Sequence, residues 1–217
     1  MNIPEQTHEV EVPVGRLKVG GTLGIPDGPI GTVIFAHGSG SSRFSKRNAM
    51  VATVLRRASL ATLLLDLLDE AEAEDRSNIF DIELLAGRLA MAANWVRHHR
   101  GLNMLPIGLF GASTGAAAAL VAAAGDRQIA AVVSRGGRPD LAGDLLRDVH
   151  APTLLIVGGA DHGVIELNER AFEQLPGPRR LEVVPGATHL FEEPGALEQV
   201  SVLAREWFVS HLSAVRV

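Results

Sequence analysis

The chain has 217 residues, 47% of them hydrophobic, which is enough for a compact domain with a sizeable buried core. Its formal net charge of −5 and its pI of about 5.9 argue against nucleic acid or an anionic membrane surface as a partner. It contains no cysteine, which excludes a disulfide framework, a thiolate nucleophile and a cysteine-based metal site.

The overall organisation of the chain predicts one domain that does not enter a membrane. The first residues lack the basic start and apolar core of a signal peptide, and no apolar run approaches the about 18 residues of a membrane span. We therefore expect a cytoplasmic protein. No linker, repeat or low-complexity tract divides the chain, so a single domain is expected over residues 1–217. Its oligomeric state is open between a monomer and a small homo-oligomer.

The N-terminal third predicts a hairpin followed by strands buried on both faces. Residues 8–14 alternate polar and apolar side chains, and a turn at Gly15-Arg16 connects them to a second strand at 17–25. The apolar runs at 31–36 and 60–65 are typical of central strands of a parallel sheet. Apolar positions at helical spacing over 46–58 place a helix between these two runs.

The remaining two thirds alternate helices with strands. The acidic stretch Asp69 to Asp75 is predicted to be a solvated loop, and 138–149 has room for a short helix at most. The other predicted elements are strands at 106–110, 129–134, 152–157 and 180–184 and helices at 78–98, 113–124, 165–174 and 194–212. This alternation predicts an α/β fold, an about eight-stranded, mostly parallel sheet with helices on both faces.

Residues 111–115, Gly-Ala-Ser-Thr-Gly, lie between a predicted strand and a predicted helix. That context is what a G-x-S-x-G nucleophile elbow requires, because the tight turn presents the serine hydroxyl at the end of the sheet. A residue larger than glycine at 111 or 115 would collide with the neighbouring strand or helix. Ser113 is therefore a candidate nucleophile, and it needs a base beside it.

Two downstream segments supply the partners that such a serine needs. Asp161 follows the strand at 152–157, and His189 follows the strand at 180–184. His189 would accept the proton of Ser113, and Asp161 would orient the imidazole and stabilise its charged form. Asp66 and Asp140 are competing candidates for the acid, but the position after the penultimate strand favours Asp161.

The order Ser113, Asp161, His189, together with the strand end Phe35-Ala36-His37-Gly38, resembles the α/β hydrolases, and in particular the dienelactone hydrolase-like subgroup. The resemblance covers nearly the whole chain and implies the α/β-hydrolase fold. An oxyanion hole is expected from the backbone N–H groups of Ser39 and Thr114, with Gly40 as the alternative first donor. His37 is expected to tie this loop together by hydrogen bonds.

The chain departs from the dienelactone hydrolases proper, which use a cysteine nucleophile where this chain has Ser113. This favours a serine carboxylic ester hydrolase with a small-molecule ester as its substrate. Hydrolysis of thioesters or lactones by the same triad, acyl transfer, and a non-enzymatic binding role are the alternatives. Relatives with the Leu64-Leu65-Asp66-Leu67-Leu68 strand end and its acidic loop are also found joined to phosphoribosyltransferase domains.

The expected pocket follows from what the sequence lacks. Larger α/β hydrolases insert a lid where this chain has residues 135–149, so we expect no substantial lid domain and an open, shallow pocket that suits short-chain esters. Arg135, near the expected site, would contact a substrate carboxylate or pair with Asp140. No histidine and carboxylate trio has metal-ligand spacing, so neither a metal nor a cofactor is expected.

Overall fold

The structure, a computed structural model, describes residues 7–213 of the chain. Its centre is an eight-stranded sheet with the strand order β1-β2-β4-β3-β5-β6-β7-β8. The strands are β1 (Thr7–Val14), β2 (Leu17–Gly24), β3 (Gly31–Ala36), β4 (Leu60–Leu65), β5 (Ile107–Ala112), β6 (Ile129–Arg135), β7 (Thr153–Gly158) and β8 (Arg179–Val184). The β1–β2 and β2–β4 pairs are antiparallel and all others are parallel, which confirms the mostly parallel sheet predicted from the sequence.

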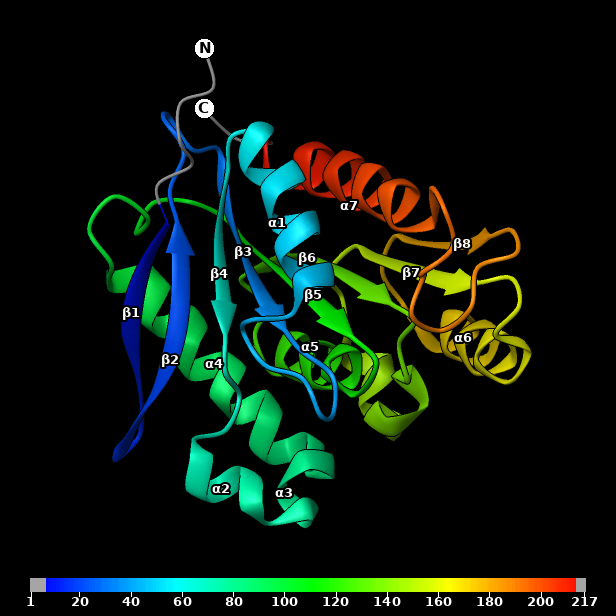
Figure 1. The fold of residues 1–217 in the computed structure, drawn as a ribbon, viewed down its shortest axis with the longest axis horizontal. Coiled ribbons are helices and arrows are strands. Elements are labelled where there is room, and N and C mark those ends of the chain that lie inside the picture. The colour runs from blue at the N-terminus through cyan, green and yellow to red at the C-terminus, as the bar shows by residue number, and fades with distance from the viewer. Residues whose placement is uncertain (1–6, 214–217) are drawn as a thin grey trace.

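Helices cover both faces of this sheet (Figure 1). One face is covered by α1 (Lys46–Arg57) and α7 (Ala196–Leu212). The other carries α4 (Ile82–His98), α5 (Thr114–Gly125), the 3₁₀ segment η1 (Pro139–Asp148) and α6 (His162–Gln174). Within residues 7–213 no helix has both the length and the apolar character needed to cross a bilayer.

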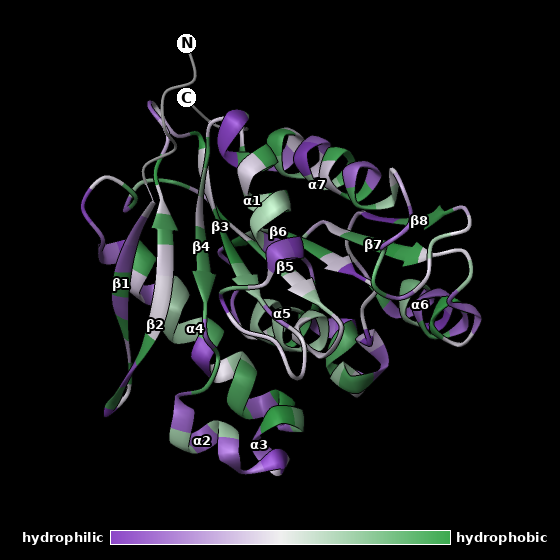
Figure 2. Cartoon of the chain, in the orientation of Figure 1, coloured by the Kyte–Doolittle hydropathy of each residue, from purple (hydrophilic) through white to green (hydrophobic). Residues whose placement is uncertain are grey.

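The sheet separates two apolar cores, because its central strands are buried on both faces. All side chains of β3, β4, β5 and β7 are buried, as their uninterrupted apolar runs predict. Most residues of α5 are alanine, and these small side chains let the helix pack closely against the sheet. Figure 2 shows the same contrast in hydropathy, with apolar residues along the central strands and hydrophilic ones on the outlying helix α2 (Glu70–Glu74).

The acidic stretch predicted as a loop is helical, so that prediction is wrong. It forms α2, and α3 (Arg76–Phe80) follows directly; each helix has five residues. Asp69 and Glu72 form a capping box that satisfies the free backbone N–H groups at the start of α2. The carboxylate of Asp75 then accepts from the N–H of Ser77 and starts α3.

The long helix predicted from Asn78 begins four residues later, at Ile82. Asp81 leaves the helical conformation, with φ −76° and ψ 88°, and its carboxylate accepts from the N–H of Leu84. Asp81 therefore ends α3 and caps α4, which splits the predicted element in two. The short helix expected over 138–149 is present as η1, with a kink at Gly143.

Candidate active site

Ser113 lies at the sharp turn between β5 and α5, with φ 53° and ψ −121°. A positive φ is costly for a residue with a side chain and persists only where the surroundings enforce it. The two flanking glycines make the turn possible. A Cβ on Gly111 would lie 2.3 Å from Cα of Ala116, and one on Gly115 would lie 2.4 Å from the carbonyl oxygen of Ala36. The predicted need for glycine at both positions is confirmed.

The structure brings Asp161 and His189 to this turn from β7 and β8. Nδ1 of His189 lies 2.7 Å from Oδ2 of Asp161, and its Nε2 lies 3.3 Å from Oγ of Ser113. Asp161 is largely buried, whereas 38% of the His189 side chain is exposed. An imidazole that donates from Nδ1 to a carboxylate presents an unprotonated Nε2 to the serine. Ser113, His189 and Asp161 therefore form one hydrogen-bonded chain.

Close backbone contact explains how Asp161 and His189 meet. A Cβ on Gly158 would lie 2.3 Å from the carbonyl oxygen of Ala187, so only glycine lets the two loops approach. The N–H of Ala160 then donates to that same carbonyl at 2.9 Å. The other two acids considered in the sequence lie elsewhere. Asp66 pairs with Arg43, and Asp140 pairs with Arg138.

The His189 loop is held by two side chains that the sequence analysis did not single out. The carboxylate of Glu193 accepts from both the N–H and the hydroxyl of Thr188, and these bonds lower the pKa of Glu193. Phe191 has φ 54° and is buried, so the ring anchors the loop in the core. In the sequence, the only hint of this bond is that Thr188 and Glu193 lie on either side of His189, close to it.

The loop after β3 lies opposite the elbow; Ser39 bonds it to Thr114 of the elbow, and His37 bonds it to Leu67 after β4. His37 bridges Leu67 and its own loop, because Nε2 accepts from the N–H of Leu67 at 3.2 Å and Nδ1 lies 3.0 Å from the carbonyl oxygen of Gly38. Burial lowers the pKa of His37 and so favours this neutral form. With these two contacts His37 holds the loop together, as expected from the sequence.

The two expected oxyanion donors, Ser39 and Thr114, lie side by side, but one of them is engaged. The N–H of Ser39 donates to the hydroxyl of Thr114 at 2.9 Å. Thr114 is the first residue of α5, where backbone N–H groups have no partner within the helix. Gly40, the alternative donor, has φ 69° and follows Ser39 directly in the loop.

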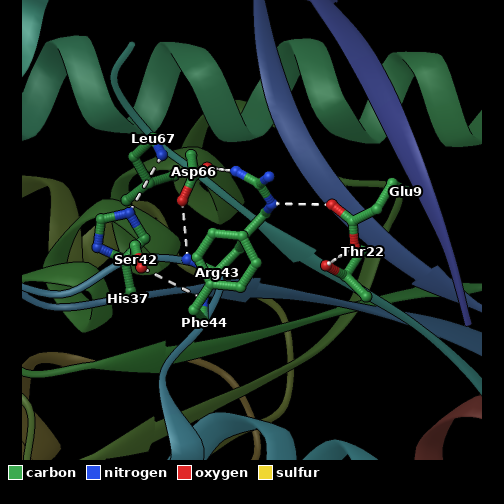
Figure 3. Close-up of polar contacts among 8 residues, drawn as sticks. All are labelled: Glu9, Thr22, His37, Ser42, Arg43, Phe44, Asp66 and Leu67. Carbon is green, nitrogen blue, oxygen red and sulfur yellow. Dashed lines mark hydrogen bonds and ion pairs between the residues drawn. The ribbon is translucent and has the colours of Figure 1, made fainter. Parts of the chain in front are cut away.

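Arg43 fastens this loop to the edge of the sheet (Figure 3). Its backbone N–H donates to Asp66 at 2.8 Å, and its guanidinium contacts both Asp66 and Glu9. The guanidinium crosses β2 at Gly20, where a Cβ would lie 2.4 Å from Nη1. Arg43 therefore connects the candidate oxyanion loop to β1, β2 and the end of β4.

A cavity of about 450 Å³ opens beside Ser39 and Thr114, the expected oxyanion donors. Its lining includes Thr114, the loop 37–44 that carries Ser39, and the apolar side chains of Leu67, Leu68, Ile79 and Leu85. The helices α2 and α3 supply one wall of the cavity, with Ala73 and Ile79, and α2 lies where the sequence predicts a solvated loop.

Arg135 does not line this cavity. It is 5% exposed and donates to Oδ1 of Asn48 at 3.2 Å, and no carboxylate among residues 7–213 pairs with it. Burial, together with the nearby charge of Arg47, lowers its pKa to about 10, which leaves the guanidinium charged at neutral pH. The expected pairing with Asp140 is wrong, because Asp140 pairs with Arg138.

Within the described part of the chain, no group of three or more histidine and carboxylate side chains could hold a metal ion. The polar groups at the site are those of the Ser113, His189 and Asp161 chain and the backbone N–H groups opposite. A strong acceptor for the serine proton next to N–H donors is the arrangement that acyl transfer needs.

The chain matches a protein-family model and two curated proteins. A model of the dienelactone hydrolase family matches residues 48–207. Two proteins from strains of Mycobacterium tuberculosis that carry a provisional phosphoribosyl transferase name are each 60% identical over 210 residues. That match covers 96% of this chain but 47% of each relative, so the chain spans about half the length of the curated relatives it matches.

Solved structures agree with the predicted fold. The dienelactone hydrolase from Anabaena variabilis is 56% identical, with a TM-score of 0.93 over 95% of this chain and 98% of that one. A serine hydrolase without a lid from Xanthomonas campestris is 22% identical, with a TM-score of 0.77 over 98% of each chain, a likeness of fold alone. The α/β-hydrolase fold expected from the sequence is confirmed.

Proposed function

Because the chain belongs to the dienelactone hydrolase family, we propose that it is a serine hydrolase that cleaves carboxylic esters through an acyl-enzyme. The observation that carries this proposal is the continuous contact from Asp161 through His189 to Ser113. A serine hydroxyl is a weak nucleophile at neutral pH, and this contact provides the base that activates it.

The reaction divides into two halves that use the same three side chains. Oγ of Ser113 attacks the ester carbonyl carbon while Nε2 of His189 takes its proton. The imidazolium, stabilised by Asp161, then protonates the departing alcohol, and the acyl group stays on Ser113. A water molecule, deprotonated by His189, attacks the acyl-enzyme and releases the carboxylic acid and the free serine.

The negative oxygen of each tetrahedral intermediate needs N–H donors. We assign this role to Thr114, at the start of α5, and to Ser39 across the loop, with Gly40 as the alternative to Ser39. For Ser39 to act, the oxyanion must replace the Thr114 hydroxyl as the acceptor of its N–H. Both residues line the cavity, which supports their access to substrate.

Lactone hydrolysis is a second candidate, since a lactone is an internal ester and the same residues would open it. It is favoured by the name of the 56% identical dienelactone hydrolase from Anabaena variabilis. The phosphoribosyl transferase name belongs to relatives of which this chain covers 47%. We propose that the protein acts on a small-molecule substrate in the cytoplasm, as a monomer or small homo-oligomer.

The proposal is tested with a fluorophosphonate probe and p-nitrophenyl acetate and butyrate. The probe should label the wild-type chain at Ser113, and Ser113→Ala should lose both labelling and at least about 10³-fold of the ester turnover. Ser210→Ala, on the exposed surface of α7, is the control and should behave as the wild type. Full turnover by Ser113→Ala would exclude the triad, and a folded wild-type chain that is neither labelled nor active would support the binding role.

A further inference from the structure

The cavity beside Ser39 and Thr114 lies on one side of the reacting atoms, which decides which part of the ester it can hold. In the tetrahedral intermediate the leaving oxygen must face Nε2 of His189, because it receives its proton there. None of Ser113, His189 and Asp161 lines the cavity, which lies on the side of the oxyanion donors. Gly38 links it to the serine, because Gly38 is on the lining and a Cβ there would lie 2.9 Å from Cβ of Ser113. Since the alcohol faces His189, the cavity is left for the acyl part of the ester.

The walls of the cavity are mostly apolar. Leu67 and Leu85 are buried, Leu68 and Ile79 are half-buried, and the exposed ring of Phe44 stands on the lining. A volume of about 450 Å³ falls within the range of sites that enclose drug-sized ligands. An acetyl or butyryl group would leave much of this apolar surface in contact with water.

The charged groups on the lining favour an uncharged occupant. They are one guanidinium, of Arg43, and three carboxylates, of Asp66, Asp69 and Glu70. Figure 3 shows the guanidinium between Asp66 and Glu9, both of which it contacts, so its charge is compensated. His37 is also on the lining, and burial lowers its pKa and keeps it neutral. A carboxylate entering here would meet like charges and no free cation.

We infer that this cavity binds an uncharged, apolar acyl group longer than butyryl, while the alcohol part of the ester stays on the His189 side. This inference rests on the proposed function and names the acyl class that it prefers. The specificity-determining wall is the α2–α3 segment, which supplies Ala73 and Ile79 to the lining.

A series of p-nitrophenyl esters tests the inference, because a constant leaving group isolates the acyl contribution. From acetate to butyrate to hexanoate, each methylene that enters the cavity should raise kcat/KM up to about fourfold, with at least about tenfold over the series. Hydrogen adipate, whose terminal carboxylate replaces the methyl group of hexanoate, should fall at least about tenfold below hexanoate.

Three variants on α2 locate the effect in the cavity. Ala73→Phe, which narrows the lining from α2, should lower kcat/KM for hexanoate at least about fivefold relative to acetate. Ala71→Phe is the matched control, because Ala71 is an exposed alanine of the same helix that does not line the cavity. Glu70→Lys should raise the adipate-to-hexanoate ratio of kcat/KM.

The outcomes separate this inference from the proposed function. A flat chain-length profile, or equal effects of Ala73→Phe and Ala71→Phe, would overturn the acyl assignment while fluorophosphonate labelling of Ser113 still upheld the hydrolase. A preference for adipate over hexanoate would also overturn it. Failure of both labelling and turnover would remove the hydrolase and, with it, the acyl site.

Discussion

The backbone N–H of Ser39 donates a 2.9 Å hydrogen bond to the side-chain hydroxyl of Thr114, 75 positions along the chain. The two residues that we propose as oxyanion donors are thus bonded to each other before substrate arrives. The Thr114 hydroxyl accepts from an N–H that the proposed reaction needs. This hydrogen bond must therefore break when the intermediate forms.

Thr114→Val removes that hydroxyl while keeping the shape of the side chain. We expect kcat/KM to rise by up to about fivefold, since one hydrogen bond of about 1 kcal/mol no longer competes with the oxyanion, and the free energy of unfolding to fall by about 1 kcal/mol. Thr114→Ser keeps the hydroxyl and should match the wild type in both. A tenfold loss of activity in Thr114→Val would mean that the hydroxyl instead positions the loop.

Asp161→Asn should lower kcat for p-nitrophenyl butyrate by about 10⁴-fold, because the amide no longer holds His189 in the tautomer that accepts the serine proton. Asp140→Asn is the matched control, since its carboxylate binds Arg138 on the surface segment η1. Steady-state kinetics of both variants distinguish the acids. Equal losses in both would contradict the assignment of Asp161.

His37 should make the folded state less stable in mild acid. Burial holds its folded pKa below the unfolded value of about 6.5, with Asp66 partly opposing the shift. The unfolded chain therefore binds the proton more readily, so stability is full above about pH 6.5 and is lost as the pH falls through the unfolded value toward the folded one. Melting temperatures between pH 5 and 8 should show a shallower decline in His37→Gln, and an unchanged slope would contradict this origin.

Arg43→Met should lower the free energy of unfolding by about 1–3 kcal/mol, because it leaves the largely buried carboxylate of Asp66 without its charged partner. It should also raise KM, since the β3–α1 loop that carries Ser39 loses its anchor. Lys18→Met, which breaks an exposed ion pair with Glu11 on the same edge of the sheet, should cost much less, because solvent screens that pair. Urea titration measures both, and equal losses would show that Arg43 is no anchor.

Arg135→Met tests whether this buried cation has a role in binding. The guanidinium is buried without a carboxylate partner among the described residues, so an apolar replacement of similar length should keep or raise the melting temperature. Activity on neutral esters should stay within about twofold, because Arg135 does not line the cavity. A selective loss of activity on anionic esters would restore the substrate contact expected from the sequence.

The sequence predicts the sheet well because burial on both faces leaves a strong signal. The bounds of β3 and β4 agree with their apolar runs, and Ser113, Asp161 and His189 each follow a strand as predicted. Parallel strands end at one edge of a sheet, so residues that follow such strands are brought together by topology alone.

The acidic segment shows what sequence patterns miss. Its residues have no apolar periodicity, and the two helices there depend on the capping carboxylates of Asp69 and Asp75. Contact with the remainder of the fold also contributes, since Arg88 of α4 pairs with Glu72. The Ser39–Thr114 bond has the same origin, because it joins residues that only the completed sheet brings together.

The cavity walls formed by α2 and α3 lie in a different part of the chain from the reacting side chains. The reactive groups follow β5, β7 and β8, whereas these two helices lie between β4 and α4 and start with their own caps. If the cavity is the acyl site, exchange of residues 69–81 should change which acyl group is accepted without disturbing the groups proposed to cleave it. Residues 69–81 are therefore the segment to vary, by directed evolution or by design, in order to change the acyl preference of the protein.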